Sequence, residues 1–115
     1  MIALLAVAIL APRHLTTAQI ETLYLRETRA HYHTLANRHE ARCFSRIIFR
    51  ESRGDTHCRT GRYFGLGQLG PPVRRRYGGN TTNPREQIRA AIKYIRSRYH
   101  RPSRAWKHWQ RHRSY

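Results

Sequence analysis

The sequence predicts a small, mostly α-helical single domain with a glycine-rich middle that contains a short β region. Its 115 residues leave room for one modest hydrophobic core. Apolar residues recur at helical spacing on both sides of the middle of the chain. All 7 glycines fall between residues 54 and 79, together with Pro71 and Pro72, and this composition is typical of loops and turns.

The first segment, residues 1–15, opens with the apolar stretch MIALLAVAILAP. It is too short to span a bilayer, which takes about 20 apolar residues. Its length fits the apolar region of a secretory signal peptide, and Ala6-Val7-Ala8 offers small residues for cleavage, although no positive charge precedes it. The alternative is an apolar segment that packs on the domain, and the sequence leaves both open.

Residues 16–40 are expected to form an N-terminal helix. Thr16 and Gln19 have the spacing of a capping box, and a weak apolar stripe follows them. Asn37, with Glu40 three residues later, is a second helix start. Either one long helix or two helices with a bend could therefore cover residues 17–51.

Residues 41–50 have the clearest helical period in this half of the chain. Phe44, Ile47, Ile48 and Glu51 stand at i, i+3, i+4 and i+7 and so share one face. From Ser52 to Gly79 we expect loops and turns, with a short strand over residues 63–66.

The last part of the chain predicts two further helices. Asn83 is the expected N-cap of the first, with Pro84 at its first position and Glu86 at its third. One face of this helix is apolar: Ile88, Ala91, Ile92, Ile95 and Tyr99. Pro102 ends that helix, and Ser103 is the expected cap of a short final helix with Ala105, Trp106 and Trp109 on one side.

The charge of the chain predicts a polyanionic partner. There are 23 basic and 6 acidic residues, for a net charge of +17. Nucleic acid, an anionic membrane surface and an acidic cell wall all satisfy this condition. The arginines are spread along the whole chain, with no zinc-finger or single-strand-binding signature, so the pattern does not favour a specific nucleic-acid binder.

Glu51 is the candidate catalytic residue. A carboxyl group held against apolar side chains loses hydration, which raises its pKa and suits it to act as a general acid near neutral pH. The alternative is a solvated glutamate at a frayed helix end, or one paired with Arg50 or Arg53.

A helix ending in Glu51-Ser52, then a loop, then Gly65-Leu66-Gly67-Gln68, resembles the lysozyme-like lytic transglycosylases. The stretch NPREQIRAAIKYIRSRYHRPSRAWKHWQRHRSY is similar to the ending of actinobacterial and actinophage members. The resemblance covers residues 41–115 and implies a lysozyme-like α+β domain with its cleft floored by residues 65–68. Many members have Ala-Tyr-Asn where Ala105-Trp106-Lys107 stands, and a tryptophan in place of Ser114.

The resemblance implies cleavage of peptidoglycan glycan strands without a metal or cofactor. Glu51 would protonate the glycosidic oxygen between N-acetylmuramic acid and N-acetylglucosamine and then act as a base on the muramic 6-hydroxyl, giving a 1,6-anhydro product. Ser52 would orient Glu51 or the sugar, and Gln68 would bind substrate. The remaining candidates line the cleft: Gly65, Leu66, Tyr94, Trp106 and Tyr115. For Trp106 the alternative is core packing.

Several alternatives stay open at this stage. The protein could be an ordinary lysozyme-like hydrolase, an inactive wall-binding or phage-tail module, or a basic nucleic-acid binder. Cys43 and Cys58 could form a disulfide in an exported protein or stay as thiols in a cytosolic one. The expected location is secreted or cell-wall bound, or virion-associated if phage-encoded. His39-Glu40-Ala41-Arg42-Cys43 resembles a zinc motif but ends in Cys.

Overall fold

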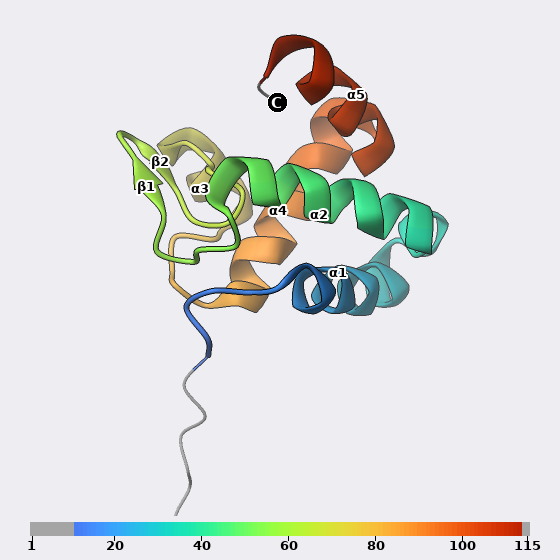
Figure 1. Ribbon diagram of the computed structural model, residues 1–115, viewed down its shortest axis with the longest axis horizontal. Coiled ribbons are helices and arrows are strands. Elements are labelled where there is room, and N and C mark those ends of the chain that lie inside the picture. Colours follow the sequence, from blue (N-terminus) through green and yellow to red (C-terminus); the bar gives the residue numbers. More distant parts are fainter. Residues whose placement is uncertain (1–10, 114–115) are drawn as a thin grey trace, which may run out of the picture.

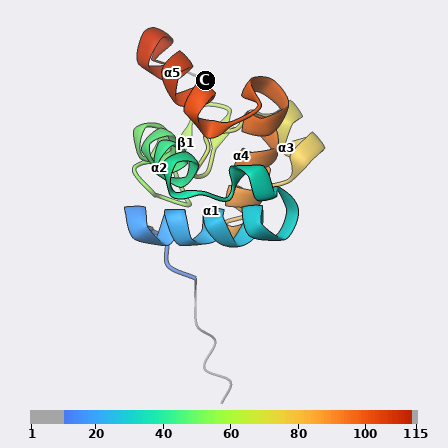
Figure 2. The ribbon, with the colours of Figure 1, turned by 90° about the vertical axis from the view of Figure 1, so that its right-hand side faces the viewer.

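A computed structural model of the chain describes residues 11–113. α2 and α4 occupy the middle, with α1 on one side and α5 on the other (Figures 1 and 2). The elements in chain order are α1 (Thr17–His31), the 3-10 turn η1 (His33–Leu35), α2 (Arg38–Ser52), β1 (Arg59–Thr60), β2 (Tyr63–Phe64), α3 (Pro71–Tyr77), α4 (Pro84–Tyr99) and α5 (Pro102–His112). The predicted mostly helical domain with a short β region is confirmed.

Three of the predicted helix starts are confirmed by their caps. The Thr16 hydroxyl accepts from the Gln19 amide at 3.2 Å, and the Gln19 side chain accepts from the Thr16 amide at 2.8 Å. Asn37 caps α2 by accepting from the Glu40 amide at 2.9 Å. Asn83 caps α4. Because α1 ends at His31 and α2 begins at Arg38, two helices cover residues 17–51.

Two predictions about prolines were wrong. Arg101, not Ser103, is the N-cap of α5, because Pro102 takes the first helical position. Ser103 instead donates through its amide and its hydroxyl to the Glu40 carboxylate, at 2.8 and 2.9 Å, and so ties α5 to α2. Pro71 and Pro72 begin the seven-residue helix α3 in a region where we expected loops, turns and one short strand but no helix. Proline breaks a helix interior but is well suited to a first turn.

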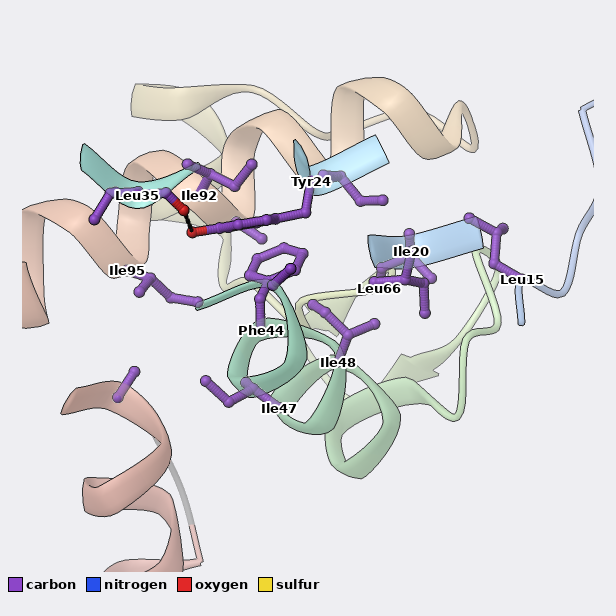
Figure 3. Packing of buried hydrophobic residues seen from close by; sticks show 14 residues of the cluster. Leu15, Ile20, Tyr24, Leu35, Phe44, Ile47, Ile48, Leu66, Ile92 and Ile95 are labelled. Carbon is purple, nitrogen blue, oxygen red and sulfur yellow. Dashed lines mark hydrogen bonds between the residues drawn. The ribbon is translucent and has the colours of Figure 1, made fainter. Parts of the chain in front are cut away.

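One hydrophobic core joins α1, α2 and α4 (Figure 3). Tyr24 of α1 meets Phe44 of α2 with ring centroids 4.8 Å apart, and its hydroxyl donates to the Leu35 carbonyl at 2.8 Å. Ile48 and Leu66 are also fully buried in this cluster. Burying one such side chain is worth roughly 2 kcal/mol, so the N-terminal helix and the segment beyond residue 41 stabilise each other.

The chain before α1 is held against the loop that follows α2. Leu15 donates its amide to the Gly54 carbonyl at 2.8 Å, and Thr56 donates to the Arg13 carbonyl at 2.8 Å. Residues 1–10 lie outside the described residues, so both readings of the signal-like segment stay predictions. Within residues 11–113, no helix has the length and apolar character needed to cross a membrane.

Candidate active site

A cavity of about 590 Å³ lies between the end of α2, the β1–β2 hairpin, the start of α3, and α4 and α5. Three of the predicted site residues, Glu51, Gln68 and Tyr94, meet in its wall. The residues that line it are Glu51, Thr60, Arg62, Tyr63, Gln68, Leu69, Gly70, Pro71, Pro72, Val73, Tyr94 and Arg113. The cavity has the size and mixed lining of a ligand site.

Glu51 projects into the cavity from the last turn of α2, where Arg53 ends the helix in a left-handed conformation with φ 55°. Its side chain is half-buried, and the indole Nε1 of Trp109 donates to its Oε1 at 3.1 Å. Burial raises the pKa of Glu51, and the hydrogen bond from Trp109 partly offsets that rise. The carboxyl group therefore keeps its proton to a higher pH than a solvated glutamate does.

The other carboxylates of the chain are used elsewhere. Each accepts a hydrogen bond outside the cavity: Glu21 from Ser45, Glu27 from Arg89, Glu40 from Ser103, Asp55 from Arg13 and Glu86 from Thr81. Within the described part of the chain, Glu51 forms no ion pair with Arg50 or Arg53. Glu51 is therefore the one carboxylate among residues 11–113 that lines the cavity.

The β1–β2 hairpin forms one wall of the cavity. Arg59 pairs with Phe64 and Thr60 with Tyr63, so the predicted strand is found at residues 63–64 while residues 65–66 leave it. The turn is kept in place by Arg74 of α3, whose Nη1 donates to the carbonyls of Arg62 and Leu69. This wall depends on hydrogen bonds to the backbone, because two-residue strands make few of their own.

The loop after β2 supports the floor of the cavity. Gly65 has φ +82°, and a Cβ on it would lie 2.9 Å from the side chain of Gln87. Leu66 is fully buried, so neither Gly65 nor Leu66 is among the lining residues. Gln68 does line the cavity, and its Nε2 donates to the carbonyls of Cys58 and Gly65 at 2.9 Å each.

Gln87 of α4 holds this loop, and the sequence reasoning missed it. Its Oε1 accepts from the Leu66 amide at 2.8 Å, and its Nε2 donates to the carbonyls of Thr56 and Thr81 at 2.8 and 2.6 Å. One buried amide thus joins three segments of backbone. The signal was present in the sequence, since Gln87 stands four residues before Ala91 on the apolar face of α4.

Two further predicted site residues, Ser52 and Trp106, are not among the residues that line the cavity. Ser52 is buried, and its hydroxyl donates to the Ile48 carbonyl at 3.1 Å and accepts from the Gly54 amide at 3.3 Å. Trp106 packs against the core and stacks on Trp109, with ring centroids 5.7 Å apart. Tyr115 lies outside the described residues. Tyr94 does line the cavity, and burial raises its pKa.

Residues from α5 and the hairpin turn take places in the site that the sequence reasoning did not assign. Trp109 holds Glu51, and Arg113 lines the cavity with its guanidinium 5.5 Å from the centre of the Trp109 ring. Arg62 lines the cavity from the hairpin turn. The apolar side of α5 gave a hint of Trp109, whereas nothing in the sequence distinguishes Arg62 and Arg113 from the other arginines.

The two cysteines are free thiols in the structure. The disulfide that the sequence left open is therefore absent from it. Cys43 is buried in α2, which raises its thiol pKa, while Cys58 is half-buried. Across residues 11–113, no cluster of three His, Cys, Asp or Glu side chains is placed to hold a metal ion.

No protein-family model matches the chain, and no curated protein or solved structure shows significant similarity to it. The cavity and its chemistry are therefore the observations that bear on function.

Proposed function

We propose that the protein is a lytic transglycosylase that cuts the glycan strands of bacterial peptidoglycan, with Glu51 as its catalytic acid and base. The observation that carries this proposal is the placement of Glu51. It is a half-buried carboxyl with a raised pKa, and it is the one carboxylate among the described residues in a cavity of about 590 Å³. The lysozyme-like fold belongs to the same proposal, as does a secreted, wall-bound or virion-associated location.

A single carboxylate in the cavity favours one of two kinds of glycosidase chemistry. Hydrolysis of the usual type needs a second carboxylate, about 5 Å away in retaining enzymes and roughly 6.5–9.5 Å away in inverting ones. No second carboxylate lines this cavity within residues 11–113. A nucleophile supplied by the substrate removes the need for one, and the 6-hydroxyl of N-acetylmuramic acid is such a group.

In the proposed reaction, protonated Glu51 gives its proton to the glycosidic oxygen as the bond to C1 of the muramic acid breaks. The resulting carboxylate then takes the proton of the muramic 6-hydroxyl, whose oxygen bonds to C1. The products are a 1,6-anhydro end and a free 4-hydroxyl, and Glu51 is protonated again. A raised pKa suits both steps, because the same group has to give and accept a proton near neutral pH.

The cavity wall offers contacts that a sugar can use. Tyr63 is the large hydrophobic side chain with the greatest exposure among the described residues, at 50%, and it lines the cavity with Tyr94. Aromatic faces suit the apolar face of a sugar ring, while Thr60 and Gln68 supply polar atoms. The net charge of +17 would attract the anionic polymers of a cell wall.

The test is mass spectrometry of purified peptidoglycan digested with the wild type, Glu51→Gln and Glu86→Gln. Glu86 is an exposed acid outside the cavity and serves as the matched control. We expect anhydro-muropeptides from the wild type and Glu86→Gln but not from Glu51→Gln. Reducing-end products would instead indicate a hydrolase. No products from a protein that binds the wall would indicate an inactive wall-binding module.

Nucleic-acid binding is the second candidate, and the net charge of +17 is the observation that favours it. Fluorescence anisotropy with labelled single- and double-stranded oligonucleotides at near-physiological salt tests it. Tight binding of nucleic acid, together with no binding or cleavage of peptidoglycan, would replace the transglycosylase proposal.

A further inference from the structure

We propose that Arg62 and Arg113 form an anion-binding subsite in the Glu51 cavity that takes a carboxylate of the substrate. The subsite rests on the proposed function for the identity of its ligand, a glycan strand with a carboxylate close to the bond that is cut. On a strand without peptide that carboxylate is the lactyl group of muramic acid. Where a peptide is attached, the lactyl group is bound as an amide and the carboxylate is an acid of the peptide.

Arg62 is fixed at the tip of the hairpin. Gly61 and Arg62 form the two-residue turn between β1 and β2, and Gly61 has the positive φ of 60° that such a tight turn requires. The Arg62 carbonyl accepts from Nη1 of Arg74 at 3.0 Å, so the backbone at the turn is held by α3. The Arg62 side chain is exposed and lines the cavity.

Arg113 enters the cavity from the opposite end of the sequence. It is the C-cap of α5, with φ 58°, and its amide donates to the Trp109 carbonyl at 2.7 Å. Its guanidinium lies 5.5 Å from the centre of the Trp109 ring. The same ring donates to Glu51 at 3.1 Å, so Arg113 and Glu51 lie against one tryptophan and line one cavity.

Among residues 11–113, the positive charge that lines the cavity exceeds the negative charge. Arg62 and Arg113 are the two lysine or arginine side chains among residues 11–113 that line it, and Glu51 is the one acid. Neither arginine forms an ion pair with a carboxylate in the described part of the chain. All 6 acidic residues of the sequence lie within that part, and the other five accept hydrogen bonds elsewhere.

The chemistry of guanidinium points to a carboxylate as the ligand group. A planar fork of N–H donors matches the two oxygens of a carboxylate or a phosphate. In peptidoglycan the charged groups beside the cut bond are carboxylates, and burial keeps Glu51 protonated over a wider pH range, which limits its repulsion of such a group. Since both arginines are exposed, we expect a moderate effect, about tenfold in affinity.

The test measures binding separately from cleavage, using calorimetry with the inactive Glu51→Gln protein. The first pair of ligands is a peptide-free glycan oligomer with free lactyl carboxylates and the same oligomer with those carboxylates amidated. The second pair is a peptide-bearing oligomer before and after amidation of its peptide carboxylates. Tighter binding of the unamidated member of the first pair identifies the lactyl group as the ligand. Tighter binding of the unamidated member of the second pair identifies an acid of the peptide.

We expect the unamidated member of at least one pair to bind about tenfold more tightly, with a preference that weakens as salt is added. Adding Arg62→Gln or Arg113→Gln should remove most of that preference. Adding Arg104→Gln, an exposed residue of α5 outside the cavity, should leave it intact while removing the same charge. Arg113→Lys keeps the charge without the planar fork. Its preference for the unamidated ligand should lie between those of Arg113→Gln and Arg104→Gln.

Equal dissociation constants within both pairs, or a preference that survives Arg62→Gln combined with Arg113→Gln, would overturn the subsite. Turnover by the wild type reports the proposed function on its own. Cleavage without any preference for carboxylates keeps the enzyme and removes the subsite. A preference that depends on the two arginines, without cleavage, keeps the subsite and removes the enzyme.

Discussion

The helical core and the cavity side of the molecule are stabilised in different ways. In the core, Tyr24, Phe44 and Ile48 are fully buried and pack side chain against side chain. On the cavity side, residues 58–77 form two strands of two residues each and a seven-residue helix. Polar side chains hold that region, as Gln87 and Arg74 donate to or accept from its backbone.

The difference separates what stabilises the fold from what shapes the site. Apolar burial has no direction, so a core tolerates changes that preserve its volume. Hydrogen bonds are directional, and a buried polar group left without a partner is costly. We therefore expect core substitutions to change mainly stability, and cavity-side substitutions to change mainly activity.

The largest effect expected on the cavity side is that of Glu51→Gln. Loss of the general acid should reduce product formation about 10³-fold, with no loss of stability. Burial raises the pKa of Glu51, so the contribution of Glu51 to wild-type stability is fully present below the ordinary glutamate pKa and is lost as pH rises through the raised value. The amide does not titrate. In urea unfolding, the variant should thus have the same free energy of unfolding as the wild type in acid and a larger one at neutral pH.

That comparison would be broken by two results. If the stabilities of the two proteins differed by the same amount at every pH, the carboxyl of Glu51 would not be desolvated in the folded state. If Glu51→Gln were inactive and also unfolded more easily at neutral pH, Glu51 would stabilise the fold, as the core residues do.

Phe44→Ala should give the largest effect in the core. Phe44 is fully buried, so its truncation to alanine should cost about 3–5 kcal/mol of unfolding free energy. Phe49→Ala on the same helix is the control, because Phe49 is half-buried and should lose less. The folded fraction of Phe44→Ala should keep its activity per molecule. A large loss of activity per folded molecule would show that packing in the core also determines the geometry of the site.

Gln87→Met should affect both sides at once. It keeps most of the volume but leaves the Leu66 amide and the carbonyls of Thr56 and Thr81 without their partner. We expect a loss of about 2–3 kcal/mol in urea unfolding and a fall in activity, because the floor of the cavity loses its anchor. Arg89→Met on the same helix is the control, because the half-buried Arg89 bonds Glu27 and lies outside the cavity, and it should leave activity unchanged.

An activity of Gln87→Met equal to that of the wild type, per folded molecule, would contradict the anchoring role. The loop over residues 65–68 would then keep its shape by its own backbone geometry, including the positive φ of 82° at Gly65.

The two regions also differ in how far the sequence predicts them. Helix starts at Thr16, Asn37 and Asn83 were predicted because a cap acts over three residues, within reach of a local pattern. The apolar face shared by Phe44 and Ile48 followed from the helical period in the same way. α3 was missed because two prolines and a glycine-rich surrounding indicate a turn as strongly as a helix start.

In the site, the sequence predicted roles for Glu51 and Gln68, which both line the cavity, but not for the residues that support them. Trp109 lies 58 positions from Glu51, and Gln87 lies 21 positions from Leu66. Contacts over such distances leave no local pattern, and in a chain with 23 basic residues an arginine in a cavity looks like any other. A buried polar residue on an apolar helix face was the one usable signal, and it pointed to Gln87.

The smallest effect we predict concerns the hydrogen bond from Trp109 to Glu51. Trp109→Phe keeps an aromatic ring but removes the Nε1 donor that lies 3.1 Å from Oε1. That bond lowers the pKa of Glu51, so its loss should move the alkaline limb of kcat/KM to higher pH, since this limb reports deprotonation of the acid in the free enzyme. We expect the activity at the optimum to fall by only about fivefold, as for one hydrogen bond.

Trp106→Phe is the matched control, because Trp106 stacks on Trp109 without bonding Glu51. It should leave the limb in place. Tyr94, Arg62 and Arg113 share the cavity with Glu51, so the titration of Glu51 itself is best followed by carbon NMR of its carboxyl. If the pKa of Glu51 stays unchanged in Trp109→Phe, or moves to a lower value, burial and not the hydrogen bond from Trp109 determines that pKa. The helix α5 would then belong to the core and not to the site.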